Sequence, residues 1–171
     1  MTTVTSSCQN KTPMSPDTLQ HDHSKSLDTA ARWAGFLGLL PFVLALLLAT
    51  AGADGGLAPL GVQIAIAWGA VILSFIAAVH WGYALAGWLP WSMGTVVSAT
   101  LPSVVGAAAV LLGGEKGIVL LVAGFGLFWL FEHRALASEL PSDYLELRRM
   151  LTIGVCTLLV LTAFAGSGAH S

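Results

Sequence analysis

Hydrophobic residues occur along this chain in five long stretches, which shorter polar or glycine-rich segments separate. The stretches cover residues 33–51, 60–85, 88–112, 117–131 and 147–165. A helix needs about 20 apolar residues to cross the hydrocarbon core of a bilayer, and four stretches reach the usual range. The fourth is shorter, so its helix must continue into the interface or thin the membrane locally. The pattern predicts an all-α bundle of five transmembrane helices.

The segments outside these stretches are polar. Residues 1–28 are rich in Ser, Thr, Asp, His and Lys, and they lack the apolar centre of a secretory signal. Such a segment buries too little apolar surface to offset its chain entropy, so we expect a disordered tail. The transmembrane domain is expected over residues 29–166, and residues 167–171 form a short C-terminal tail.

The composition supports a membrane protein. Hydrophobic residues make up 56% of the 171 residues and charged residues 9%, whereas a soluble domain has about 25% charged residues. The net charge of −2 provides no basic surface for nucleic acid, so no nucleic-acid partner is expected.

Lysine and arginine are distributed unevenly between the two sides of the predicted bundle. The side that carries the N-terminus has six of them: Lys11, Lys25, Arg32, Arg134, Arg148 and Arg149. Lys116 lies alone on the other side. Positive residues accumulate on the cytoplasmic side of a membrane, so we predict a cytoplasmic N-terminus and an external C-terminus.

Small residues recur at every fourth position of the second and third stretches. The second stretch has Ala70, Ser74, Ala78, Gly82 and Ala86, and the third has Gly94, Ser98, Pro102 and Gly106. Residues four apart share one face of a helix, and small side chains let two helices approach closely in lipid. We therefore predict that these two helices form a tight hairpin.

Polar side chains in a membrane are costly, and they are functional candidates by default. Those of this chain, with neighbouring aromatic residues, gather near the predicted cytoplasmic end. The candidates for ligand contact or function are Ser74, His80, Trp81, Trp129, Glu132, Tyr144 and Arg148. His80 points away from the predicted hairpin. It could face the bundle, where Glu132 or Tyr144 would form a hydrogen bond with it, or it could face the lipid headgroups. Its role is open between structural or interfacial, proton relay or small-molecule contact, and ligation of haem or metal.

The aromatic and basic residues at this end each allow two interpretations. Five of the six tryptophans lie there, which is typical of an interfacial belt, although they could instead wall a ligand pocket. Arg148 and Arg149 are either a positive anchor or a headgroup site for an anionic lipid such as cardiolipin. Glu132 is positioned to pair with Arg148.

Sequence motifs of enzymes are missing. The chain has no G-x-S-x-G, Walker, H-E-x-x-H or Rossmann pattern. We therefore expect no catalytic activity, no cofactor and no metal site.

Several runs resemble a known family. They are Gly35-Phe-Leu-Gly38-Leu-Leu-Pro41-Phe42, Trp68-Gly-Ala-Val-Ile-Leu-Ser74-Phe75 running into His80-Trp81-Gly82, Leu101-Pro102-Ser103, and Leu140-Pro141-x-x-Tyr144-x-x-Leu147-Arg148-x-x-Leu151-Thr152. They resemble the bacterial membrane proteins grouped as domain of unknown function 3429, relatives of mitochondrial transmembrane protein 69. The resemblance covers residues 33–165 and implies a bacterial inner-membrane protein without an assigned reaction. It also implies a respiratory-membrane setting, and it supports Ser74, His80, Trp81, Tyr144 and Arg148 as positions to test.

From these observations we expect a non-catalytic accessory or assembly factor of a membrane complex. One alternative is a small-molecule or lipid binding membrane protein with a pocket at the cytoplasmic end. The second alternative is a small transporter, for which Gln63, Thr95, Ser98 and Thr100 are the available mid-membrane polar residues.

Overall fold

A computed structural model describes residues 33–51, 56–135 and 142–168. The chain divides into two compact units, residues 1–34 and 35–171. Of the first unit, Trp33 and Ala34 are described, and both are helical. The predicted disordered tail, residues 1–28, and most of the predicted C-terminal tail lie outside the described residues. All features discussed below belong to the second unit.

Five helices form the second unit within the described residues, and none of those residues is in a strand. They are α2 (Leu40–Ala51), α3 (Ala58–Leu85), α4 (Met93–Leu112), α5 (Gly114–Ala135) and α6 (Ser142–Gly168). Five segments, one of them α2 with the residues before it, are long and apolar enough to cross a membrane. The predicted fold class, an all-α bundle of five transmembrane helices, is therefore confirmed.

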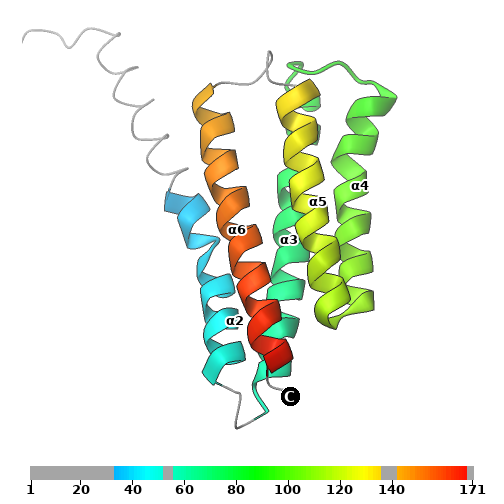
Figure 1. Ribbon diagram of the computed structural model, residues 1–171. Coiled ribbons are helices and arrows are strands. Elements are labelled where there is room, and N and C mark those ends of the chain that lie inside the picture. The colour runs from blue at the N-terminus through cyan, green and yellow to red at the C-terminus, as the bar shows by residue number, and fades with distance from the viewer. Residues whose placement is uncertain (1–32, 52–55, 136–141, 169–171) are drawn as a thin grey trace, which may run out of the picture. The chain divides into compact units, whose positions relative to one another are not determined.

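The helices are arranged around α3, which packs against α2, α4, α5 and α6 (Figure 1). The C-terminal ends of α3 and α5 and the N-terminal ends of α4 and α6 lie at one end of the bundle. We call it the 86–92 end, after the connection between α3 and α4. The opposite end carries Gly113, the single residue between α4 and α5.

The helix limits differ from the predicted ones at α4 and α5. The prediction that α4 begins at residue 88 is wrong, because α3 ends before Gly87, whose φ is +77°, and α4 begins after Ser92. The Ser92 hydroxyl accepts a hydrogen bond of 3.2 Å from the Thr95 amide and caps the helix. At α5 the helix continues to Ala135, as its short apolar stretch required.

The predicted hairpin of α3 and α4 is confirmed over part of its length. A Cβ added to Gly106 would lie 3.1–3.2 Å from the Ala70 backbone and Cβ, so the two helices touch there. Farther along the same row, Ala78, Gly82 and Ala86 are exposed. Every fourth residue advances about 40° around a helix, so a long row turns away from its neighbour. The exposed part of the row is therefore left on the outer surface.

Glycines also bring α2 close to α3 and α5 close to α4. A Cβ added to Gly61 would lie 2.5 Å from the carbonyl oxygen of Ala45 and 2.7 Å from the amide nitrogen of Ala49. At Gly117 it would lie 2.5 Å from the carbonyl oxygen of Ala109. Small residues are thus required where the backbones approach most closely.

The helix that precedes α2 is interrupted inside the apolar span. Residues up to Leu37 are helical, Gly38 and Leu39 form a turn, and α2 then begins with Leu40 and Pro41. The indole Nε1 of Trp68 on α3 donates a hydrogen bond of 3.0 Å to the Gly38 carbonyl. A break in a membrane helix is tolerated when neighbouring helices bind the freed backbone groups.

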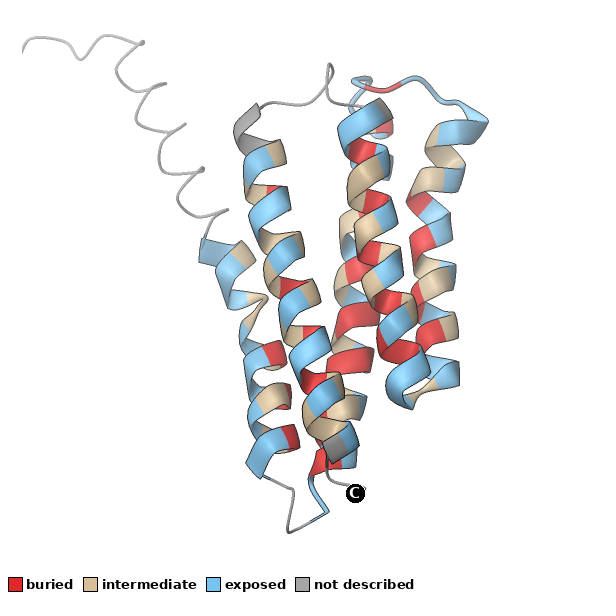
Figure 2. Ribbon diagram, viewed as in Figure 1, coloured by how far each residue is buried: buried red, intermediate tan, exposed pale blue. Residues whose placement is uncertain are grey.

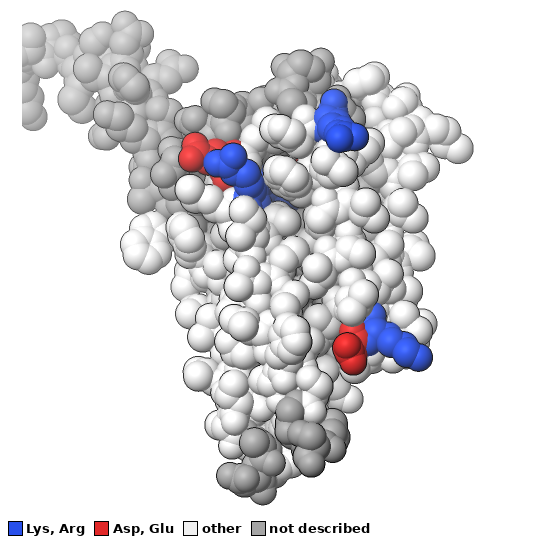
Figure 3. Space-filling model, viewed as in Figure 1, with Lys and Arg blue, Asp and Glu red and all other residues white. Residues whose placement is uncertain are grey.

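Burial divides each helix into an inner and an outer side (Figure 2). The fully buried side chains include Phe42, Leu73, Ile118, Leu121 and Leu159. Most of the outer surface is apolar, and charged side chains appear near two levels with uncharged surface between them (Figure 3). This distribution suits a bundle surrounded by lipid, where the apolar outer residues face acyl chains.

Candidate functional site

An ion pair lies inside the bundle near the 86–92 end. Arg148 on α6 donates hydrogen bonds to Oε2 of Glu132 on α5, from Nε at 3.1 Å and from Nη2 at 2.5 Å. Glu132 is 1% exposed and Arg148 is 8% exposed. Two charges that are removed from water require this kind of direct hydrogen-bonded pairing. Because Glu132 is on α5 and Arg148 on α6, the ion pair links these two helices.

His80 on α3 completes a cluster of three ionisable side chains. It is 1% exposed, and its Nε2 lies 3.8 Å from Oε1 of Glu132. Within the described residues neither ring nitrogen forms a hydrogen bond. Arg148 therefore occupies one carboxylate oxygen of Glu132, and the other oxygen faces the imidazole at slightly more than hydrogen-bond distance.

Phe128 on α5 contacts two members of this cluster. Its ring meets the His80 ring edge to face, with the centroids 5.4 Å apart and an interplanar angle of 88°. The guanidinium carbon of Arg148 lies 5.5 Å from the centre of the same ring. An aromatic face attracts a cation at such a distance.

The positions of these residues along their helices explain why they meet. His80 lies five residues before the end of α3, Glu132 three before the end of α5, and Arg148 six after the start of α6. At about 1.5 Å per residue, all three are within 10 Å of their helix ends. Phe128 is four residues before Glu132, so both share one face of α5.

The other predicted site residues lie elsewhere. Trp81 is exposed and contacts Trp91 edge to face, with the ring centroids 5.5 Å apart. Trp129 is half-buried and stacks on His133 at 5.4 Å. Ser74 donates to the Ala70 carbonyl within α3 at 2.8 Å. Tyr144 belongs to α6, but its side chain is outside the described residues.

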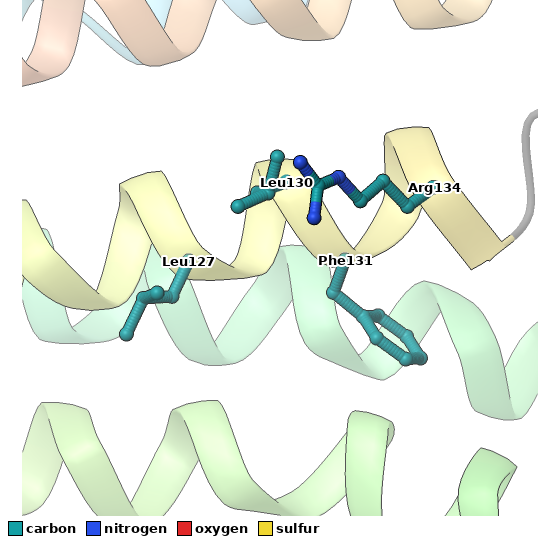
Figure 4. Close-up of a pocket in the computed structure, with 4 residues that line it drawn as sticks. All are labelled: Leu127, Leu130, Phe131 and Arg134. Carbon is teal, nitrogen blue, oxygen red and sulfur yellow. The ribbon is translucent and has the colours of Figure 1, made fainter.

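The structure therefore joins His80, Glu132 and Arg148 and does not bring Ser74 or Trp81 to them. Arg149, the second residue of the predicted headgroup site, is exposed on α6. Sequence reasoning missed Phe128, although its spacing to Glu132 could have found it. It also missed Arg134, which is exposed and lines a surface hollow with Leu127, Leu130 and Phe131 (Figure 4).

The cluster is a closed arrangement rather than an open pocket. Three hollows on the surface of the described residues are lined neither by His80 nor by Glu132. The buried carboxylate of Glu132 can accept hydrogen bonds from Arg148 and from His80. The opposite charges of Glu132 and Arg148 compensate each other, which limits the free-energy cost of burying them. In the described residues, no group of three or more His, Cys, Asp or Glu side chains is arranged to bind a metal ion.

The fold and this site define a multi-pass helical membrane protein with a buried ion pair between helices. The family model of proteins of unknown function DUF3429 matches residues 27–164, and the chain belongs to this family. The chain is also 31% identical over 145 residues to Transmembrane protein 69 of Xenopus tropicalis. That match covers 80% of this chain and 55% of the relative, so the chain spans about half the length of that relative. No solved structure matches the chain.

Proposed function

We propose that this protein is a non-catalytic accessory or assembly factor of a membrane complex that binds its partner through helix contacts within the bilayer. The observation that carries the proposal is the exposed part of the small-residue row, at the end of α3 and directly after it. Ala78, Gly82 and Ala86 are exposed, and nothing lies within 4 Å of a Cβ added to Gly82. We call these three residues the small-residue surface.

Small residues on a lipid-facing surface suit the approach of a second helix. Association in lipid depends on van der Waals contact, which small side chains permit over a long stretch of backbone. Trp81 lies three residues after Ala78, and it is exposed together with its neighbour Trp91. Large aromatic residues beside a close contact often anchor an interface. The small-residue surface and this aromatic pair thus support binding of a partner helix.

The buried cluster also favours an accessory role over the two alternatives. Glu132 and Arg148 bind each other and join α5 to α6, and His80 faces them from α3. Their polar groups are directed at other helices of the bundle rather than at a solute. A bundle that is fixed in this way is well suited to hold a surface in place for a partner.

We also propose that the protein lies in a bacterial inner membrane with its N-terminus in the cytoplasm. Arg134, Arg148 and Arg149 lie near the 86–92 end, and Lys116 lies near the opposite end. The bias of positive residues supports this orientation. The family resemblance of the sequence motifs supports the bacterial setting, with respiratory complexes as the first candidates for the partner.

The experiment is affinity purification of the full chain from native membranes in mild detergent, followed by mass spectrometry. Wild type is compared with Gly82→Leu and with the matched control Gly126→Leu. A Cβ meets nothing within 4 Å at either glycine, so we expect both variants to fold, and thermal unfolding of each variant checks this. We expect stoichiometric membrane subunits with wild type and Gly126→Leu, and their loss with Gly82→Leu.

Two results would contradict the proposal. One is recovery of the intact chain alone from membranes that contain all its neighbours. The other is equal recovery of the same subunits with Gly82→Leu and Gly126→Leu, because partner binding would then not use the small-residue surface. Recovery of the chain with a bound small molecule would favour the ligand-binding alternative.

A further inference from the structure

Two hollows on the outer surface share part of their lining. The first has a volume of about 310 Å³ and lies between α4 and α5, with small residues such as Gly94, Ser98 and Gly124 in its wall. The second has a volume of about 340 Å³ and extends along α5 to Arg134 (Figure 4). Leu127 and Phe131 line both hollows. The two hollows therefore adjoin along α5, and we call them together the α4–α5 groove.

The wall of the α4–α5 groove is apolar apart from its end. The Ser98 hydroxyl donates to the Thr95 carbonyl at 3.0 Å, and the Thr95 hydroxyl donates to the Pro90 carbonyl at 2.9 Å. These hydroxyl groups are therefore engaged within the helix and the preceding turn. The groove presents mostly hydrocarbon surface, and a single cationic side chain, Arg134, lines it near the 86–92 end.

The length of the groove matches one leaflet of a bilayer. On α5 it extends from Gly124 to Arg134, and on α4 from Gly94 to Val105. These ranges advance ten and eleven steps of about 1.5 Å each, or about 15–17 Å along a helix. The hydrocarbon core is about 30 Å thick, so one leaflet contributes about 15 Å. An acyl chain of one leaflet therefore has the length of the groove.

Arg134 lies where the headgroup of such a lipid would be. It is in the last turn of α5, at the end of the membrane-spanning segment, and it is exposed. Its side chain turns back along α5 toward Leu130 (Figure 4). Within the described part of the chain, no ion pair involves Arg134. Its charge is therefore available to an anionic group at the mouth of the groove.

We propose that the α4–α5 groove binds an anionic phospholipid of the surrounding bilayer. One acyl chain lies along Gly94, Ser98 and Leu127, and the lipid phosphate meets the guanidinium of Arg134. A guanidinium matches phosphate geometry with two parallel hydrogen bonds. Charge complementarity favours this occupant over a zwitterionic lipid, whose net charge is zero. It also favours a lipid over a partner helix, which supplies no phosphate at this depth.

The experiment measures lipid binding to the purified full chain in detergent by native mass spectrometry. Phosphatidylglycerol and phosphatidylcholine with identical acyl chains are titrated separately. We expect wild type to bind phosphatidylglycerol about fivefold more tightly, as one basic residue at a membrane surface provides. Arg134→Gln should remove this preference and leave phosphatidylcholine binding unchanged, whereas Arg134→Lys should retain most of it.

Two further variants distinguish this groove from the rest of the surface. Arg149→Gln is the matched control, because Arg149 is exposed and lines none of the described hollows; it also tests the headgroup site predicted from the sequence. Gly94→Leu fills the groove, and its new Cβ would have Ser92 Oγ at 3.6 Å as its nearest neighbour. We expect Arg149→Gln to bind as wild type and Gly94→Leu to lose the tightly bound lipid.

Three results would overturn the proposal. The first is equal binding of both lipids to wild type, which indicates only non-selective lipid around the bundle. The second is an equal loss of selectivity in Arg134→Gln and Arg149→Gln. The third is unchanged phosphatidylglycerol binding in both Arg134→Gln and Gly94→Leu. Thermal unfolding of each variant, measured in parallel, shows whether it is folded.

Discussion

The indole of Trp68 binds the carbonyl oxygen of Gly38 across two helices, at 3.0 Å. Pro41 has no amide hydrogen, and the turn at Gly38 and Leu39 interrupts the helix before α2. Phe42 donates instead to the Leu39 carbonyl at 3.0 Å. The Trp68 side chain, thirty residues along the chain, therefore supplies the hydrogen bond that the Gly38 carbonyl inside the apolar span would otherwise lack.

We expect Trp68→Phe to lower the free energy of unfolding by about 1 kcal/mol. The phenyl ring keeps most of the packing but leaves the Gly38 carbonyl without its donor, and hydrogen bonds between membrane helices contribute about 0.6 to 1.7 kcal/mol. Thermal unfolding of the full chain in detergent measures the change. Trp81→Phe is the control because Trp81 is exposed, and an equal loss of stability in both variants would contradict the assignment.

Removing one partner of the buried ion pair should be costly. Arg148→Met leaves the Glu132 carboxylate buried without its two hydrogen bonds, and we expect a loss of about 3–5 kcal/mol. Replacing both residues, as in Glu132→Leu with Arg148→Met, should recover much of the stability because no charge is then buried. Denaturant titration of wild type, both single variants and the double variant measures the coupling.

Arg149→Met provides the control for that series. Arg149 is exposed next to Arg148 on the same helix, and exposed charges contribute about 0–1 kcal/mol. If Arg148→Met were no less stable than Arg149→Met, the ion pair of Glu132 and Arg148 would not stabilise the packing of α5 against α6.

Two glycine-to-alanine changes on α3 should have opposite effects. Gly61→Ala places a Cβ 2.5 Å from the Ala45 carbonyl oxygen, so α2 must move, and overpacking of this kind costs about 1–3 kcal/mol. Gly82→Ala meets nothing within 4 Å and should gain about 0.5–1 kcal/mol from helix propensity. Melting temperatures of the two variants should therefore lie on opposite sides of wild type, and a lower value for Gly82→Ala would show that its surface is covered.

The proposed orientation predicts which engineered cysteines an impermeant maleimide reaches from outside the cell. In a background without Cys8 and Cys156, Lys116→Cys should react in intact spheroplasts. Arg149→Cys should react after the membrane is permeabilised. Reaction of Arg149→Cys alone in intact spheroplasts would reverse the assigned orientation.

Much of the fold could be predicted from the sequence because membrane spans have a fixed length. The five stretches, the continuation of α5 past residue 131 and the contact of Gly106 with α3 all followed from apolar length and small-residue spacing. The predicted start of α4 at residue 88 was wrong because Trp88 and Leu89 extend the apolar run. Pro90 and the Ser92–Thr95 cap were the better signals for the start of this helix.

The sequence predicted the level of the candidate site along the membrane, but not which side of each helix faces the bundle. Glu132 and Arg148 share a level, and the sequence indicated that they could pair. Whether His80 faced the bundle or the headgroups was open, because a helix that is apolar on all sides gives no direction for its core. The Trp68 bond to Gly38 could not be predicted, since it depends on how far two helices slide past each other.

The central position of α3 has a consequence for biosynthesis. Since α3 precedes α4, α5 and α6 in the chain, each of these helices enters the membrane after one of its contact partners is already there. Chains are made from the N-terminus, so α4 meets α3, α5 meets α3 and α4, and α6 meets α2, α3 and α5. The bundle can therefore be assembled in the order of its synthesis, one helix at a time.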